Sequence, residues 1–241
     1  MLPAPSARIG FERSQLLTEA LQSKLEATLT RYISYLEKIG FTKPDASVTV
    51  AVEAMDTPNA YYMVGKNRIV IDHRLADDPS VALREYSHHV LIREKSFGTS
   101  SQLTAIESGL ADYFSCSFLN TPNVGEKVGA VFQLPTSYLR TLKHNRTFAE
   151  MTSGVNRQQV LSIGEIWGGF FWDLREQIEP AEPAAADSLV AAAWLSFQTP
   201  ANAARVFPDF GAALLKAAET KGPRALEVVK AAAAARKLPG S

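Results

Sequence analysis

Cysteine, excess charge and long apolar runs are scarce in this sequence, and each absence excludes something. The single cysteine, Cys116, can form no disulfide within the chain, so we expect it to be a small core residue. The 25 basic and 25 acidic residues balance to zero net charge, which argues against nucleic acid or an anionic membrane as partner. No apolar run approaches the roughly 18 residues that a membrane-spanning helix requires, so we expect no membrane segment in this chain.

What is present is the composition of an ordinary globular protein. Hydrophobic residues make up 46% of the 241 positions and charged residues 21%, which suits one large domain or two lobes that share a core. The N-terminal residues 1–13 contain no apolar stretch of the kind that a signal peptide carries. This favours a cytoplasmic protein, but the sequence is also compatible with export or with a larger membrane-linked protein. It does not determine the oligomeric state.

Apolar periodicity separates a mixed first half from a helical second half. Residues 14–39 have apolar side chains at helical spacing, and residues 47–71 predict a strand followed by a hairpin. Asp78 before Pro79 predicts the cap and first residue of another helix. The segment 121–154 looks irregular, apart from one helical turn. After it, alanine-rich or apolar stretches predict helices at 158–177, 184–197, 201–216 and 223–235.

The segment from Leu83 to Val90, which reads LREYSHHV, is nearly a zinc-binding helix. In an H-E-x-x-H helix, histidines at positions i and i+4 share one face and bind Zn²⁺, while the glutamate polarises the metal-bound water. Glu85 and His88 stand at the glutamate and second-histidine positions, but Arg84 stands at the first. A guanidinium keeps its proton in proteins and cannot ligate a cation.

A second segment, AIESGLADYF at 105–114, resembles the second metal-site helix of the gluzincins, the thermolysin-like and fungalysin-like zinc peptidases. That helix reads roughly E-G-x-A-D-Y; its glutamate is the third zinc ligand and its aspartate orients the first histidine. Here Ser108, twenty residues after His88, replaces the glutamate, and Asp112 matches the aspartate. Glu107 is adjacent, but one helical step turns a side chain by roughly 100°, so it should not simply fill the ligand position.

A third segment, VLSIGEIWGGFFWDL at 160–174, resembles the fungalysin-like V-H-x-x-G-E-x-W element, whose histidine stabilises the transition state. Leu161 stands at the histidine position. Leucine donates no hydrogen bond to an oxyanion. In other enzymes, removal of such a donor raises the activation free energy by roughly 3 kcal/mol. The large aromatic residues of this segment also predict a buried core helix.

A fourth segment begins at Asn59 and resembles the edge strand beside which thermolysin-like peptidases lay their substrate. This motif is intact, and its peptide-binding positions are Asn59, Ala60, Tyr61 and Tyr62. An ordinary edge strand would account for the same residues equally well.

The four segments together resemble a gluzincin-type metallopeptidase, degenerate at its metal site, over roughly residues 47–176. The resemblance implies a zincin-like α+β fold, with a small mixed sheet and the motif helices followed by a mostly helical C-terminal lobe. We expect the lobes to span 1–120 and 121–241 and to form one compact unit.

The resemblance also implies that catalysis has been lost. A catalytic zinc needs three protein ligands and an open position for water, and only one of the three ligand positions, His88, keeps a ligand. We therefore expect no metal and no cofactor. The positions that remain from the site are Arg84, Glu85, His88, Ser108, Asp112 and Leu161.

Charge balance predicts where Arg84 goes. Asp112 and Glu85 would face the space that a metal occupies in the peptidases, and unpaired buried carboxylates are costly. We expect the guanidinium of Arg84 to enter this space and pair with Asp112, Glu107 or Glu85.

Two function classes follow. The first is an inactive metallopeptidase homologue that binds a peptide or protein partner along the edge strand, where backbone hydrogen bonds need no catalysis. The second is a metal-dependent hydrolase with a rearranged zinc site built from Glu85, His88, His89 and Glu107. A purely structural role, with the groove filled by the protein's own chain, is a third reading.

Overall fold

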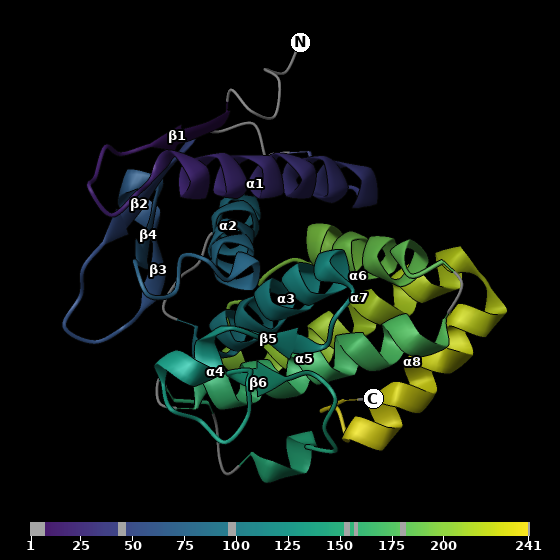
Figure 1. Cartoon of the computed structure of the whole chain (residues 1–241). Helices are drawn as coiled ribbons and strands as arrows, with labels where there is room; N and C mark the ends of the chain where they lie inside the picture. Colours follow the sequence, from purple (N-terminus) through teal and green to yellow (C-terminus); the bar gives the residue numbers. More distant parts are fainter. Residues whose placement is uncertain are drawn as a thin grey trace.

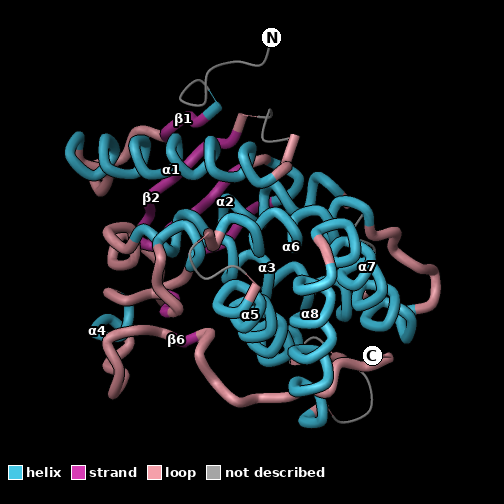
Figure 2. The backbone as a smooth tube through the Cα atoms, turned by 90° about the vertical axis from the view of Figure 1, so that its right-hand side faces the viewer, coloured by secondary structure: helices cyan, strands magenta, loops and turns pink. Residues whose placement is uncertain are grey.

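The protein is described by a computed structural model covering residues 8–42, 47–95, 100–151, 155–156, 159–178 and 182–240. It is a mixed α+β structure, as predicted, with a small sheet at one side and helices filling the rest (Figures 1 and 2). In Figure 1 the sheet stands at the left, α3 and α5 occupy the centre, and α6 to α8 lie at the right.

The main sheet has four strands in the order β1-β2-β4-β3. The strands are β1 (Ile9–Phe11), β2 (Val48–Glu53), β3 (Ala60–Met63) and β4 (Arg68–Asp72). The pairs β1/β2 and β2/β4 are parallel, whereas β3 runs antiparallel to β4 and forms one edge. The sequence did not predict β1, because its three residues are too few to show alternation.

Local capping sets the ends of the first helices. Helix α1 (Glu19–Ile39) begins later than predicted, because Thr18 caps it by accepting a hydrogen bond from the backbone of Leu21; Gly40, with φ +119°, ends it as expected. Helix α2 (Pro79–Glu94) begins as predicted, with Asp78 accepting from the backbone of Ser80. Helix α3 (Ser101–Leu119) is buried over most of its length.

The second half is helical, with one shifted boundary. The long helices are α5 (Val160–Gln177), α6 (Ala184–Ser196), α7 (Val206–Lys221) and α8 (Pro223–Arg236). The predicted helix 201–216 instead starts at Val206, since Asn202 caps a separate 3-10 turn, η4 (Ala203–Arg205), and the helix runs on to Lys221. Gln158, the predicted first residue of α5, lies outside the described residues.

Short elements make up the described part of the segment 121–154. They are β5 (Asn123–Val124), α4 (Val128–Val131), β6 (Arg140–Thr141) and the 3-10 turn η3 (Phe148–Glu150), while a further 3-10 turn, η2 (Val64–Lys66), closes the β3–β4 hairpin. Strands β5 and β6 pair with each other, which brings Arg140 beside α3. The segment is largely irregular, as predicted.

Helices α3 and α5 approach each other very closely at their glycines. A Cβ atom added at Gly109 would lie 2.6 Å from both the Gly164 carbonyl oxygen and the Trp167 Cβ. The aromatic side chains of α5 are fully buried, which confirms the predicted core helix. Because α3 and α5 belong to different predicted lobes, their packing joins the two in one hydrophobic core; the boundary at residue 120 stays a prediction.

Two further predictions concern Cys116 and membrane-spanning helices. Cys116 is fully buried in α3, and burial raises the pKa of its thiol, in keeping with a core residue. Among the described helices, none combines the length and the apolar character needed to cross a bilayer.

The substitution Gly109→Ala should destabilise the protein by about 1–3 kcal/mol, because the added methyl group must push α3 and α5 apart. Urea unfolding measures the change. Gly65→Ala is the matched control, since nothing lies within 4 Å of a Cβ atom there. An unchanged midpoint for Gly109→Ala would contradict the packing described above.

Candidate functional site

The guanidinium of Arg84 lies between helices α2 and α3. Its Nε donates to Asp112 Oδ1 at 2.8 Å, its Nη1 to Glu85 Oε1 at 2.8 Å and its Nη2 to Ser108 Oγ at 3.2 Å. Only 16% of the Arg84 side chain is exposed. The expected pairing of Arg84 with carboxylates is therefore confirmed for Asp112 and Glu85, and three of the predicted site positions converge on it.

Asp112 is shared by two arginines. Besides its bond from Arg84, it accepts hydrogen bonds from Arg140 Nε at 2.8 Å and from Arg140 Nη2 at 2.6 Å. Burial alone would raise the pKa of this carboxyl, but the charges of Arg140 and Arg84 outweigh it and lower the pKa from 3.8 to about 2. Asp112 is therefore ionised near neutral pH and joins α2, α3 and β6.

Arg84 remains charged in this environment. Burial opposes its charge, but Asp112 and Glu85 outweigh that effect and hold its pKa above the usual value for arginine. A permanent cation therefore occupies the space beside Glu85.

The two histidines of α2 point to different partners. His88 Nδ1 makes a short contact with Glu107 Oε1 of α3, and both side chains are largely buried. His89 instead bonds through Nδ1 to the Tyr62 hydroxyl at 3.0 Å, below the sheet edge. The four residues of the rearranged metal site are thus not gathered at one point.

The residues present do not fit a catalytic zinc. Zinc takes thiolate, imidazole or carboxylate ligands at about 2.0–2.3 Å. Within the described ranges, no three side chains of histidine, cysteine, aspartate or glutamate come close enough together to hold a metal. The carboxylates of Glu85 and Asp112 are engaged by Arg84, and a second cation there would be repelled by its charge.

A cavity of about 330 Å³, hereafter the groove, opens beside this cluster. It runs between the start of β3, helix α2, the segment 124–140 and the first turn of α5. The residues that bear on function among those lining it are Asn59, Ala60, Arg84, Glu85, Arg140 and Leu161. Five of the ten predicted site residues therefore line one cavity, and Leu161 is 60% exposed there.

The free edge of β3 adjoins the groove. The Asn59 carbonyl accepts a hydrogen bond from the Asp72 N–H at 2.9 Å. Along a strand the backbone N–H and C=O groups of successive residues point to opposite sides, so those of Tyr61 face β4, whereas those of Ala60 and Tyr62 face outward. The side chain of Asn59 bonds to the Ala60 N–H at 2.9 Å. An extended chain could therefore pair with Ala60 and Tyr62 through main-chain hydrogen bonds.

The tyrosine side chains of β3 do not line the groove. Tyr62 packs towards α2 and bonds through its hydroxyl to His89 and Asn67. Tyr61 points to the opposite face of the strand and is 39% exposed. Of the predicted peptide-binding side chains, only Asn59 and Ala60 are found in the groove wall.

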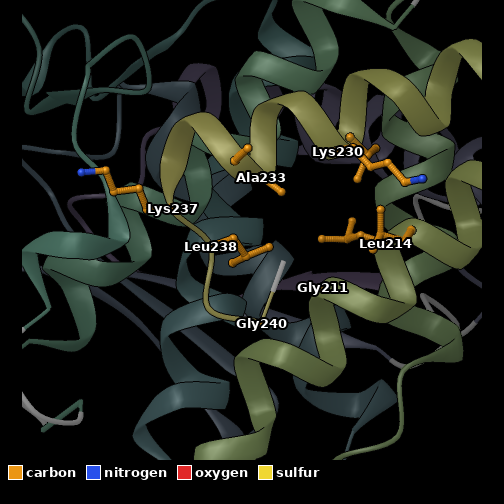
Figure 3. A pocket seen from close by; sticks show the side chains of 10 residues that line it. Gly211, Leu214, Lys230, Ala233, Lys237, Leu238 and Gly240 are labelled. Atoms are coloured by element: carbon orange, nitrogen blue, oxygen red, sulfur yellow. The ribbon is translucent and has the colours of Figure 1, made fainter.

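A larger cavity, of about 570 Å³, lies between α7 and α8 (Figure 3). Its lining is mostly leucine, alanine and glycine. The amino groups of its two lysines, Lys230 and Lys237, point away from it in different directions. Without convergent polar groups it is a weaker candidate for a functional site than the groove.

Sequence reasoning missed Arg140. It lies in the irregular segment before α5, where no periodic pattern or motif indicates the direction of a side chain. Its role depends on the pairing of β5 with β6, which brings it to Asp112 from 28 residues away. No signal in the sequence identifies this contact.

The comparisons with known proteins bear on the fold. The sequence matches no protein-family model, and no curated protein is similar to it. The structure resembles the precursor of protealysin, a metalloproteinase from Serratia proteamaculans, with a TM-score of 0.67 and 12% identity over 95% of this chain and 81% of that one. An M1 zinc metallopeptidase from Deinococcus radiodurans gives a TM-score of 0.49 and 16% identity over 95% and 47% of the two chains. The similarity to the protealysin precursor shows that the protein has a metallopeptidase-like fold.

Replacing Asp112 with asparagine should destabilise the protein by roughly 3–5 kcal/mol, because Arg84 and Arg140 lose their shared charge. Asp56→Asn, an exposed carboxylate, is the control and should change stability by less than about 0.5 kcal/mol.

The pH dependence gives a second readout of the same residue. The folded-state pKa of Asp112 is lowered, so its contribution of about 2 kcal/mol is present above pH 4 and is lost as pH falls towards 2. Urea unfolding between pH 5 and 2 should show a smaller loss of stability for Asp112→Asn than for the unmodified protein. Equal losses would contradict the pairing.

Proposed function

We propose that this protein is a catalytically inactive homologue of the metallopeptidases that binds a peptide or protein in the groove. The observation that carries the proposal is the position of the Arg84 guanidinium, bonded to Glu85, Asp112 and Ser108. The fold similarity supports the relation to metallopeptidases, and the argument for inactivity rests on the residues alone.

Arg84 acts as an internal cation in place of a metal. It pairs with the buried carboxylates of Glu85 and Asp112, the second of which it shares with Arg140, and it links α2 to α3. Unlike a zinc ion, a guanidinium has no open coordination position, so it cannot bind and acidify a water molecule. Glu85 then has no activated water to deprotonate, and Leu161 offers no hydrogen bond to an oxyanion.

The binding role rests on the form of the groove. One wall is the unpaired edge of β3, to which an extended segment can add as a further strand. The opposite wall comes from the segment before α5, which carries several exposed apolar side chains. A volume of about 330 Å³ lies at the lower end of the range that ligand sites usually have.

Zinc content tests the proposal directly. The purified protein, incubated with zinc and then desalted, should retain less than about 0.1 equivalent by mass spectrometry, because a three-ligand site is missing. The double substitution Arg84→His and Ser108→Glu should raise this to about one equivalent, since the side chains at 84 and 108 are in contact and position 88 lies one helical turn after 84 on α2.

The matched control is Arg84→Gln with Ser108→Gln, which removes the guanidinium without supplying ligands and should stay near the unmodified level. About one equivalent in the unmodified protein would contradict the proposal and favour the hydrolase with a rearranged site, in which His88 and Glu107 are already in contact. A folded double variant that binds no zinc would instead contradict the assumed correspondence of positions 84, 88 and 108.

A further inference from the structure

We infer that the ligand of the groove presents a carboxylate to Arg140 and a large apolar side chain to the exposed residues beside it. This inference rests on the proposed binding function and specifies its ligand. The occupant is a peptide with a large apolar residue at a free C-terminus.

The charge that faces the groove is positive. Two guanidiniums, those of Arg84 and Arg140, and one carboxylate, that of Glu85, line it. Asp112, which balances the second guanidinium, lies behind them and is only 1% exposed. The four charges balance, but Asp112 is shielded from the ligand by the two arginines, so an anionic group fits the groove wall better than a cationic one.

Arg140 is the arginine that is able to take the anion. All three nitrogens of Arg84 already contact acceptors, on Asp112, Glu85 and Ser108. Arg140 uses Nε and Nη2 on Asp112, and no acceptor among the described residues bonds to its Nη1. Its side chain is 19% exposed and lines the groove. A carboxylate bound to Nη1 would form a charge-assisted hydrogen bond.

The apolar side of the groove is unusually exposed. Of the seven large hydrophobic side chains that are exposed among the described residues, three line this one cavity. They are Leu161 at 60% exposure, Leu139 at 40% and Phe132 at 36%. Phe132 and Leu139 lie in the loop between α4 and β6, whereas Leu161 lies in the first turn of α5. Convergent apolar exposure of this kind indicates a binding surface.

The two features lie within the span of a single ligand residue. Leu139 and Arg140 are consecutive and both line the groove, so their apolar and cationic groups are one residue apart. At about 30 Å³ for each water molecule, 330 Å³ corresponds to roughly eleven waters, the space of one or two residues and not of a folded domain. A terminal apolar residue brings its carboxylate and side chain together at that spacing.

Four acetylated tripeptides test the inference by isotope-edited NMR titration of the whole chain. They are Gly-Ala-Phe with a free carboxylate, the same peptide as its C-terminal amide, Gly-Phe-Asp as its C-terminal amide, and Gly-Ala-Gly with a free carboxylate. We expect the first to bind at least about tenfold more tightly than its amide, because a hydrogen bond to a charged group is at stake. The affinity of the Gly-Ala-Phe acid should exceed that of the Gly-Ala-Gly acid by a similar factor, because the second peptide lacks the large apolar side chain.

Variants locate the binding. Leu161→Ser should weaken binding of the Gly-Ala-Phe acid about tenfold without affecting the fold, because the side chain is exposed. Val64→Ser is the matched control, since Val64 is 56% exposed but lies outside the groove, and it should change nothing. Arg140→Gln should remove the difference in affinity between the Gly-Ala-Phe acid and its amide. The unfolding midpoint of this variant is measured in parallel, since Arg140 also pairs with Asp112.

Each outcome decides something. Tighter binding of the Gly-Ala-Phe acid than of its amide and of the Gly-Phe-Asp amide supports the inference. Tighter binding of the Gly-Phe-Asp amide than of the Gly-Ala-Phe acid would overturn the terminal carboxylate and show that an acidic side chain is bound. Equal binding of the Gly-Ala-Phe acid and its amide, with sensitivity to Leu161→Ser, would overturn the inference while leaving peptide binding in the groove intact. If neither Leu161→Ser nor Arg140→Gln changes the peptide affinity, or if no peptide binds, the inference is overturned together with the groove as a binding site.

Discussion

The buried ion cluster of Arg84, Asp112 and Arg140 is the interaction on which the arrangement of the site depends. One carboxylate holds two guanidiniums, and the three residues belong to α2, α3 and β6. Helix α2 and β6 also line the groove, whereas Asp112 of α3 lies behind them. Removal of Asp112 would leave two guanidiniums without their shared carboxylate, which costs far more than the loss of an exposed pair.

The cluster also supplies the charge balance between α2 and α3. Carboxylates that face an interior space need a positive charge, and a guanidinium supplies it with fixed geometry and at every physiological pH. Arg84 therefore links α2 to α3 through Asp112. On the function proposed above, the same guanidinium takes the place of a metal and leaves no position for an activated water molecule.

Packing around the site is equally restrictive. Gly109 and Gly164 allow α3 and α5 to touch through their backbones, which places Ser108 directly against α5 and Leu161 at the mouth of the groove. The aromatic residues of α5 anchor that contact in the core. The groove therefore lies between the start of β3, helix α2 and the first turn of α5, and its remaining wall comes from the irregular segment before α5. This division suits a binding site whose ligand preference is set by a few exposed side chains.

The sequence by itself determined the fold class and most helix positions, because helical periodicity and capping residues such as Asp78 are local properties of the chain. It also led to the pairing of Arg84 with Asp112, since a buried carboxylate requires a cation. Only the tertiary structure decided that Arg140 shares Asp112, that His88 and His89 face different partners, and that Leu139 and Leu161 meet at one cavity. These contacts join residues far apart in the chain, or depend on the rotation of one helix against its neighbours, and neither leaves a trace in local sequence pattern.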